Sequence, residues 1–446
     1  MKKMNLHEMH EMHEFYKDHL FNVLLPFWMK FGIDHEYGAF FTCFNNAGDT
    51  LKSKNKYIWS QGRFLWMLSR LYYAFKDYLD TEEAEGLISG AGKGALFLKE
   101  HALLANGKCA WVLDQKGSPI ITNRDGTVRK QKNGDKFDLG IEADEFLIYG
   151  MAEYARAANE PEYFEFALKL FDSVSERLQS GDYKTFPHDA PDGYKTHGKS
   201  MIMLETAQEL ADIARFFSDP SADRLTAIAK ASMNETINNF VKKDDKILLE
   251  MIKQDNSTAY NEMLGSYVNP GHALEDAWFI MHFAMRISDT EAIHTGAEIV
   301  RWMTSLGWDS EYGGLPQFVH KDGGPLKGSI SSRNRENHMI KELADSWSNK
   351  LWWVHSEALY ALILAYENSG DNWFLNTYWQ FHDYVFKTFP NPDKKIGEWI
   401  QIRDRKGKPE DKVVALPVKD PYHITRAFMH LIKSLERSIA RKAGGA

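Results

Sequence analysis

Cysteine is scarce in this sequence: the 446 residues include only Cys43 and Cys109. Two cysteines cannot build the disulfide framework of a secreted scaffold, and they fit a reducing compartment. Residues 1–7 lead into charged positions rather than an apolar run, so we expect no signal peptide. No stretch is apolar for long enough to span a bilayer. The sequence therefore predicts a cytoplasmic protein that does not enter a membrane.

Basic clusters and common cofactor motifs are also missing. The formal net charge is -8, and no block of Lys and Arg stands out, which disfavours a general nucleic-acid binder. No Cys/His spacing fits zinc, and no Gly-x-Ser-x-Gly elbow is present. Residues 90–94 resemble a phosphate-binding loop, but no strand precedes them, so we expect them to be helical. We therefore expect neither a metal nor a bound cofactor.

What the sequence does contain is helical periodicity. Apolar residues recur at helical spacing in twelve segments that capping residues, prolines or glycines delimit. We expect helices near residues 6–30, 60–79, 83–104, 141–158, 161–180, 197–218, 221–241, 270–287, 290–306, 349–368, 372–388 and 422–440. No linker rich in Pro, Gly or Ser separates them, so we predict one domain over residues 1–446.

Short β-prone runs, each followed by a turn that contains glycine, recur between these helices. They occupy residues 40–49, 111–119, 318–325 and 399–409, and each predicts a β-hairpin. An even number of similar helices with recurring hairpins indicates a repeated helix-pair unit. Helix pairs that close into a ring would form an all-α fold, an (α/α)6 barrel of about twelve helices with short hairpins at one end. We expect a pocket where the hairpins meet the helix starts.

Two histidines, far apart in the chain, stand in the same local context. Asn269 is followed by Pro-Gly-His272, and Asp420 by Pro-Tyr-His423. In each case a capping residue and a proline predict a helix start, which places the histidine in the first turn. A helix N-terminus disfavours imidazolium, so we expect His272 to be neutral and available as a base, with Glu275 one turn later. Ordinary structural histidines are the alternative, but the repeated context favours a matched acid/base pair.

Aromatic residues frame two further polar groups. Trp59, Arg63 and Trp66 share a face of the second expected helix. An arginine between tryptophans suits a sugar oxygen or a developing oxyanion, although a surface cation–π stack fits the same pattern equally well.

The tenth expected helix carries the second such group. Trp353 shares a face with Glu357, and Trp352 shares a face with His355. Glutamate is rarely buried without a partner, so this pattern indicates a polar pocket floor with aromatic walls. An aromatic core around a buried glutamate is the alternative.

Taken together, these segments resemble the N-acylglucosamine 2-epimerase family, which includes mannose and cellobiose epimerases and related aldose–ketose isomerases. The matching residues are Trp59–Arg63 with Trp66, Asn269–Trp278, Trp308–Gly314, Lys350–Glu357, Glu398–Trp399, and His423 with Arg426. They extend over nearly the whole chain in one order. The family fold is a single barrel of six helix pairs, and its chemistry inverts C2 of a reducing sugar in the open-chain form.

The resemblance also implies roles for individual residues. His272 and His423 would be the acid/base residues on opposite faces of C2, and Arg63 would steady the C1 oxygen of an enediolate. Glu357 and Glu275 would hold the histidines and assist ring opening. Substrate contacts would come from Trp59, Gln61, Lys199, Trp353 and His355. Neither a metal nor a nicotinamide is required, whereas a nucleotide activator and a homodimer stay open.

Three segments depart from the family pattern. Residues 124–138 resemble an insertion, and residues 415–419 lack a Gly-rich run; both bear on the preference for an acyl-amino sugar. The sixth helix, from Lys199, lacks the histidine that cellobiose epimerases carry there, which disfavours a cellobiose enzyme.

Inversion at C2 removes a proton from one face and returns one to the other, which two opposed bases can do. The resemblance makes N-acylglucosamine and N-acylmannosamine the favoured substrates. The alternatives are a mannose/glucose 2-epimerase, an aldose–ketose isomerase that needs one histidine, a non-catalytic sugar-binding protein, and a glycoside hydrolase that uses Glu275 and Glu357.

Overall fold

The computed structural model describes residues 4–444, and most of them are helical. The long helices are α1 (Leu6–Asp18), α2 (Leu25–Phe31), α3 (Ile58–Phe75), α4 (Thr81–His101), α5 (Glu142–Ala158), α6 (Pro161–Ser180), α7 (Gly198–Phe216), α8 (Ser221–Glu235), α10 (Pro270–Ile287), α11 (Thr290–Gly307), α13 (Trp352–Ser369), α14 (Asn372–Thr388) and α15 (Tyr422–Gly444). Every helix expected from periodicity is present, and residues 90–94 lie within α4. The short helices α9 (Met263–Ser266) and α12 (His338–Ser346) were not expected. None of the helices in residues 4–444 combines the length and apolar character needed to cross a membrane.

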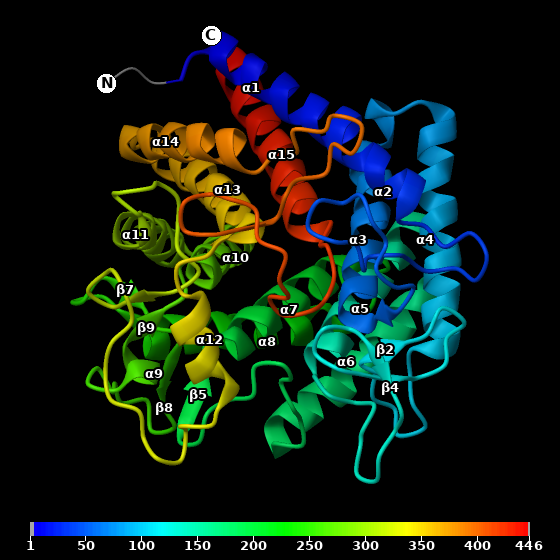
Figure 1. Ribbon diagram of the computed structural model, residues 1–446. Helices are drawn as coiled ribbons and strands as arrows, with labels where there is room; N and C mark the ends of the chain where they lie inside the picture. Colours follow the sequence, from blue (N-terminus) through cyan, green and yellow to red (C-terminus); the bar gives the residue numbers. More distant parts are fainter. Residues whose placement is uncertain (1–3, 445–446) are drawn as a thin grey trace.

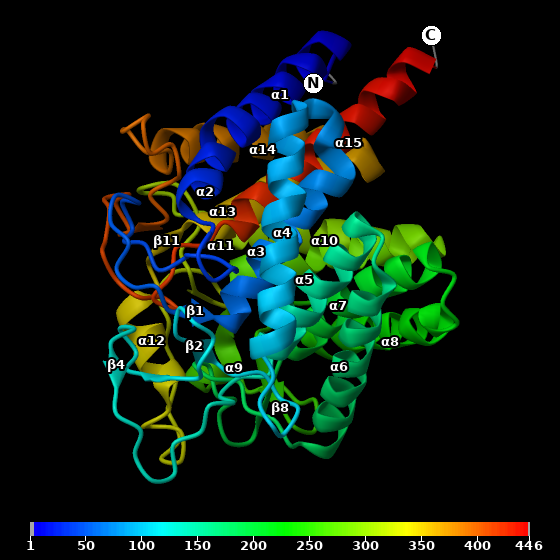
Figure 2. The same cartoon turned by 90° about the vertical axis from the view of Figure 1, so that its right-hand side faces the viewer.

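The helices form two concentric layers, as the sequence predicted (Figures 1 and 2). Helices α3, α5, α7, α10, α13 and α15 each contact the next, and α15 contacts α3 to close the inner ring. The outer helices α1, α4, α6, α8, α11 and α14 pack against this ring. The first and last helices, α1 and α15, lie side by side (Figure 1).

Burial distinguishes the two layers. Helix α13 is buried on all sides over most of its length, whereas α14 is buried along a single stripe that faces the ring. This is the difference expected between a core helix and a surface helix. Inner helices α3 and α5 cross closely at Gly62, where a Cβ atom would come within 2.1 Å of the Phe146 carbonyl oxygen. Glycine at this position therefore allows the two backbones to touch.

Short antiparallel strand pairs cluster at the starts of the inner helices. They are β1 (Lys56–Tyr57) with β2 (Val112–Leu113), β9 (Tyr267–Val268) with β10 (Val319–His320), β11 (Lys350–Leu351) with β12 (Ile402–Arg403), and β5 (Tyr194–Thr196) with β8 (Met251–Lys253). Strands β1, β9 and β11 lead into α3, α10 and α13, so these pairs fix where each inner helix begins. Two further pairs, β3 (Ile121–Thr122) with β4 (Val128–Arg129) and β6 (Val241–Lys242) with β7 (Ile247–Leu248), lie in the connections.

Three of the four expected hairpins are each closed by a single bridge, namely Phe44 with Leu51, Leu113 with Pro119 and Arg403 with Pro409. In the fourth, at residues 318–325, strand β10 pairs with β9 and not within its own turn. The longer pairings of β2 and β12 are likewise made with β1 and β11, the strands that precede α3 and α13. Pairing of this kind joins segments that are distant in sequence.

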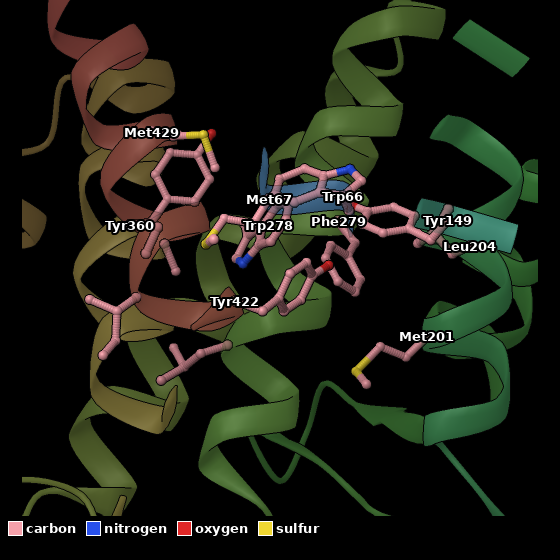
Figure 3. Packing of buried hydrophobic residues seen from close by; sticks show 14 of the residues in the cluster. Trp66, Met67, Tyr149, Met201, Leu204, Trp278, Phe279, Tyr360, Tyr422 and Met429 are labelled. Carbon is pink, nitrogen blue, oxygen red and sulfur yellow. The ribbon is translucent and has the colours of Figure 1, made fainter. Parts of the chain in front are cut away.

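An aromatic cluster fills the barrel axis, and all six inner helices contribute to it (Figure 3). Its members include Trp66, Tyr149, Leu204, Trp278, Tyr360 and Tyr422. Trp66 stacks on Tyr149 with ring centroids 5.1 Å apart, and it meets Tyr422 edge-on at 5.3 Å. Because Tyr149 and Tyr422 also line a cavity, this cluster forms its floor.

Candidate active site

The first expected histidine lies at the start of α10. Asn269 caps the helix by accepting a hydrogen bond from the backbone N–H of His272 at 3.2 Å, and Pro270 occupies the first turn. Gly271 leaves room for Trp353, since a Cβ atom there would come within 2.4 Å of the indole. The His272 side chain, about one-third exposed, donates from Nδ1 to Glu250 Oε1 at 3.0 Å. Its other nitrogen is therefore available for proton transfer.

The second expected histidine lies at the start of α15. Asp420 accepts from the backbone N–H groups of Tyr422 at 3.3 Å and of His423 at 3.4 Å. The buried His423 ring donates from Nδ1 to Glu357 Oε1 at 2.8 Å. A carboxylate only accepts hydrogen bonds, so this contact assigns a proton to Nδ1 and leaves Nε2 unprotonated in the neutral ring.

The two imidazoles meet at one aromatic side chain. The Trp353 ring centroid lies 5.3 Å from that of His272 and 5.6 Å from that of His423. Residues from α10 and α15, 151 positions apart, thus face one cavity of about 240 Å³. This is the convergence that the repeated helix-start context predicts.

Arg63 extends from α3 into the same cavity between three aromatic rings. Its guanidinium carbon lies 4.0 Å from the Phe146 ring centroid, 5.0 Å from that of Tyr422 and 5.3 Å from that of Trp59. Burial lowers the pKa of Arg63, and the nearest carboxylate oxygen, on Asp420, is 4.0 Å away. The buried Nε atom has no hydrogen-bond partner within the described residues. A buried cation with free donors suits an anionic oxygen on a ligand.

Arg426 holds the two expected glutamates together. Its Nη2 atom donates to Glu357 Oε1 at 2.7 Å and also to Glu275. Trp278 donates from Nε1 to Glu357 Oε2 at 2.7 Å. The donor atoms of Glu275, Glu357 and His423 lie close enough together to hold a metal ion. The Arg426 guanidinium already supplies positive charge to both carboxylates, however, so the residues do not fit a resident metal.

The remaining expected substrate-binding residues divide into two groups. Trp59, Trp353 and Lys199 line the cavity, and Lys199 donates to the Tyr183 hydroxyl at 2.7 Å. Gln61 and His355 are fully buried and do not belong to the cavity wall that the described residues form.

Both residues bind backbone groups instead. The Gln61 amide pairs with the backbone of Phe40 at 2.9 and 3.1 Å. His355 donates to the Leu351 carbonyl at 2.6 Å and accepts from the Leu315 N–H at 2.9 Å. The expectation that these two residues line the pocket is therefore wrong. Each side chain bonds to one backbone donor and one backbone acceptor, and so fixes the segments behind the pocket.

The two histidines have opposite pKa shifts. Burial, together with the nearby positive charge of Arg63, lowers the pKa of His423 to about 3, despite Asp420 and Glu275. Burial also lowers the pKa of His272, but the charge and hydrogen bond of Glu250 outweigh it, and the net shift is upward. The Glu250 carboxylate in contact with the ring therefore outweighs the helix terminus, which alone was expected to keep His272 neutral. His423 binds a proton less readily than an ordinary histidine, whereas His272 binds one more readily.

Sequence reasoning missed Glu250 and the residues behind it. Glu250 is buried in the turn between β7 and β8, in a segment for which no element was expected. An isolated glutamate in the apolar run Ile247–Met251 was the available signal, since buried glutamates require partners. The sixth helix has no histidine, as the sequence predicted: α7 begins at Gly198, and its residues up to Phe216 include none. The buried His197 occupies the N-cap position just before it.

The segments that depart from the family pattern lie differently around the cavity. Residues 124–138 contain β4 and are not part of the cavity wall, whereas Ala415, Leu416 and Val418 line it. Lys199, which follows His197, lines it as well.

Comparison with known proteins agrees with this geometry. A family model described as N-acylglucosamine 2-epimerase (GlcNAc 2-epimerase) matches residues 39–427. The N-acylglucosamine 2-epimerase of Rattus norvegicus is 28% identical over 419 residues, which cover 91% of this chain and 87% of that protein. The cellobiose 2-epimerase of Dictyoglomus turgidum is 24% identical, with coverage of 94% and 97%. The solved structure of cellobiose 2-epimerase from Bacillus thermoamylovorans is 19% identical and has a TM-score of 0.73, covering 95% of this chain and 99% of that one.

Proposed function

This chain belongs to the N-acylglucosamine 2-epimerase family, and from that membership and the site we propose that it inverts C2 of N-acylglucosamine or N-acylmannosamine. The observation that carries the proposal is the meeting of His272 and His423 at one cavity, each held at Nδ1 by a carboxylate. Held in this way, both rings present Nε2 to a ligand. Two acid/base groups from different helices are what inversion at one carbon requires.

The reaction begins with the open-chain sugar in the cavity. The neutral His423 removes the C2 proton, and the electron pair moves through C1 to the carbonyl oxygen. Arg63 stabilises the negative charge that develops on that oxygen. In comparable oxyanion sites, one such donor raises kcat by about 10²–10³-fold. The protonated His272 then delivers a proton to C2 from the other face. In the reverse direction His272 removes the proton and His423 returns one.

Glu275 and Glu357 support this chemistry in two ways. Glu357 orients His423, and Arg426 fixes both carboxylates. Glu275 lines the cavity and is placed to accept a hydroxyl proton as the sugar ring opens.

The charge of the cavity wall is close to balanced. Burial raises the pKa of Glu142 and Glu205 to about 8 and that of Glu145 well above its ordinary value, so these three carboxyl groups are largely neutral at pH 7. The remaining charged groups are Glu250, Glu275, Glu342 and Asp420 on one side and Arg63, Lys199, Arg426 and the His272 ring on the other. The wall therefore has no surplus of positive charge to offer a phosphate or uronate group. Apolar side chains at Ala415, Leu416 and Val418 provide a surface for an acyl methyl group, which supports the acyl-amino sugar over mannose or glucose.

The other functions explain less of the site. A hydrolase needs two free carboxyl groups on either side of a glycosidic bond, whereas Glu275 and Glu357 bind the same guanidinium nitrogen. An aldose–ketose isomerase moves a proton from C2 to C1 on one face and leaves the second histidine without a role. A non-catalytic binder has no need of two histidines with opposite pKa shifts.

The experiment is incubation of the protein with N-acetylglucosamine, N-acetylmannosamine, mannose, glucose and cellobiose, followed by separation of the products. We expect interconversion of the two N-acetylated epimers at a higher kcat/KM than any other pair. Production of a ketose would indicate the isomerase. Conversion of mannose or cellobiose alone would retain the mechanism and reject the substrate.

A further inference from the structure

We propose that His197 and Asp276 are positioning residues that hold Glu250 against His272 and so set the protonation of one of the two acid/base groups. The inference rests on the proposed function for its catalytic meaning. Its structural part, a buried chain of four residues from Asp276 to His272, can be tested without a substrate.

The chain begins and ends on the same helix. Asp276 and His272 lie one turn apart on α10. Asp276 Oδ2 accepts from His197 Nε2 at 2.7 Å, and His197 Nδ1 faces Glu250 Oε2 at 3.7 Å. Glu250 Oε1 then accepts from His272 Nδ1 at 3.0 Å. The backbone carbonyl of Glu250 also accepts from the His197 N–H at 2.9 Å, so His197 holds both ends of that residue.

Because these residues are buried, the charges in this chain act strongly on one another. His197 and Asp276 are fully buried, and Glu250 is 6% exposed. An isolated carboxylate at such a position would be strongly disfavoured, so each of the two needs a cation. His197 lies between them, and apart from His272, which bonds to Glu250, no other Lys, Arg or His side chain within the described residues bonds to either. Burial lowers the pKa of His197, but the hydrogen bond to Asp276 and the charges of Asp276 and Glu250 raise it overall to about 9. The imidazolium form therefore persists at neutral pH.

The carboxylate that holds His423 is also paired with a buried cation, but this cation is an arginine and does not titrate. Glu357 orients His423, and the guanidinium of Arg426 supplies the positive charge behind it. Each acid/base group thus contacts a carboxylate that has its own buried cation, His197 on one side and Arg426 on the other. The chemistry of the two cations differs, because an arginine stays charged at every relevant pH and a histidine does not.

This difference determines what His197 does. When His197 is charged, its positive charge partly cancels the negative charge that Glu250 exerts on His272. Removal of that charge leaves Asp276 and Glu250 as two uncompensated anions, which strengthens the field on His272 and favours its protonated form. The charged or titratable groups that act on His272 are Glu250, Glu275 and His197. Of these, only His197 has no direct contact with either His272 or the cavity.

The primary experiment is an NMR titration of protein labelled at its histidine rings, in the unmutated form and as His197→Gln and Asp276→Asn. We expect one ring, identified as His197 by its loss in His197→Gln, to carry protons on both nitrogens at pH 7. We expect the His272 titration to move to higher pH in His197→Gln, where Glu250 loses the cation behind it, while the His423 ring does not move. A neutral His197 at pH 7, or a His272 titration that is the same in all three proteins, overturns the proposal whether or not any sugar reacts.

A kinetic readout separates positioning from general destabilisation. In heavy water, exchange of the C2 proton on the face served by His272 should fall about 10–10²-fold in His197→Gln, the range expected when a reacting group is misplaced. Exchange on the face served by His423 should change less than twofold. Equal losses on both faces would mean that His197 acts only through the stability of the fold, and would reject the positioning role. If the unmutated protein exchanges no C2 proton of any sugar, the proposed function fails and the NMR result decides the inference alone.

The matched control is His282→Gln. His282 is a partly buried histidine of the same helix, α10; it bonds to the Tyr360 hydroxyl and does not line the cavity. Burial holds its pKa well below the ordinary value, so its removal deletes a ring without deleting a charge. Neither the His272 titration nor the ratio of exchange on the two faces should change in this variant.

Discussion

His423 Nδ1 lies 2.8 Å from Glu357 Oε1, and both residues are buried beside the guanidinium of Arg426. This contact does two things at once. It fixes the tautomer of His423, with the proton on Nδ1, and it fixes the orientation of the ring so that Nε2 faces the cavity. Burial together with the positive charge of Arg63 keeps the ring neutral, with a pKa of about 3. The ring is therefore a neutral base at neutral pH.

Glu357→Gln should lower kcat by about 10²–10⁴-fold, with a much smaller change in KM. The amide can donate as well as accept, so it no longer enforces the reactive tautomer, a loss that costs up to about 10⁴-fold in other histidine–carboxylate pairs. Steady-state kinetics on the preferred epimer pair will measure this effect. A rise in KM with an unchanged kcat would mean that Glu357 only binds substrate.

His272→Asn and His423→Asn should each stop net epimerisation while exchange of the C2 proton with heavy water continues for one epimer. The remaining histidine can still remove and return a proton on its own face, and the two variants should therefore retain exchange with opposite epimers. Proton NMR of each sugar measures this, and circular dichroism checks that the variants are folded. Conversion by either variant at near the unmutated rate would exclude the two-base mechanism.

The loss of kcat/KM at high pH should lie above the ordinary histidine value. The reactive form of the free enzyme carries a proton on His272 and none on His423. Because Glu250 raises the pKa of His272, kcat/KM should fall as the pH rises through that raised value. On the acid side it should fall only as the pH approaches about 3, where His423 protonates.

Both directions should share this profile, because the equilibrium between two non-ionising epimers does not depend on pH. Glu250→Gln removes the carboxylate that raises the His272 pKa, and it should move the alkaline loss to lower pH. An acid-side loss near pH 6.5 in the unmutated protein, the ordinary value for histidine, would contradict the assignment.

Activity should be unchanged after prolonged treatment with a chelator. Glu275, Glu357 and His423 have their donor atoms grouped as metal ligands would, but the Arg426 guanidinium is already bonded to both carboxylates. A divalent cation would have to displace this arginine against its charge. Assays before and after dialysis against a chelator test this, and a loss that an added divalent ion restores would show that a metal does bind.

Gly62→Ala should destabilise the protein by about 1–3 kcal/mol or more, the usual cost of forcing extra atoms into a packed core. The new methyl would lie 2.1 Å from the Phe146 carbonyl oxygen, so α3 and α5 would have to separate. Gly86→Ala in the outer helix α4 is the control, since its nearest neighbour, a Met29 methyl, would be 3.6 Å away. The control should gain about 0.5–1 kcal/mol from the better helix propensity of alanine. Thermal unfolding of both variants measures the difference, and similar melting temperatures would reject the close crossing.

Local signals in the sequence determined the helices and the presence of both histidines at helix starts. Periodic apolar residues, caps such as Asn269 and prolines such as Pro270 act within a few residues, so they can be read without a fold. The repetition of the Asn269-Pro-x-His pattern as Asp420-Pro-x-His was also visible in the sequence. The match of these and other motifs to the family predicted the barrel.

Only the tertiary structure decided which side chains share a surface. Helical spacing placed His355 and Gln61 near the expected site, but spacing fixes an angle about one helix axis and not what lies opposite. Both residues proved to face connecting segments and to bind their backbone. The same limit hid Glu250 and His197, whose partners come from other elements.

Protonation states depended on the tertiary structure most of all. The sequence placed His272 and His423 in equivalent local settings, so it predicted equivalent behaviour. Their pKa values move in opposite directions because Glu250 meets one ring, whereas deep burial near Arg63 affects the other. The energy between two charged groups depends on their distance and their burial. Folding decides both quantities, so neither can be predicted from the local sequence.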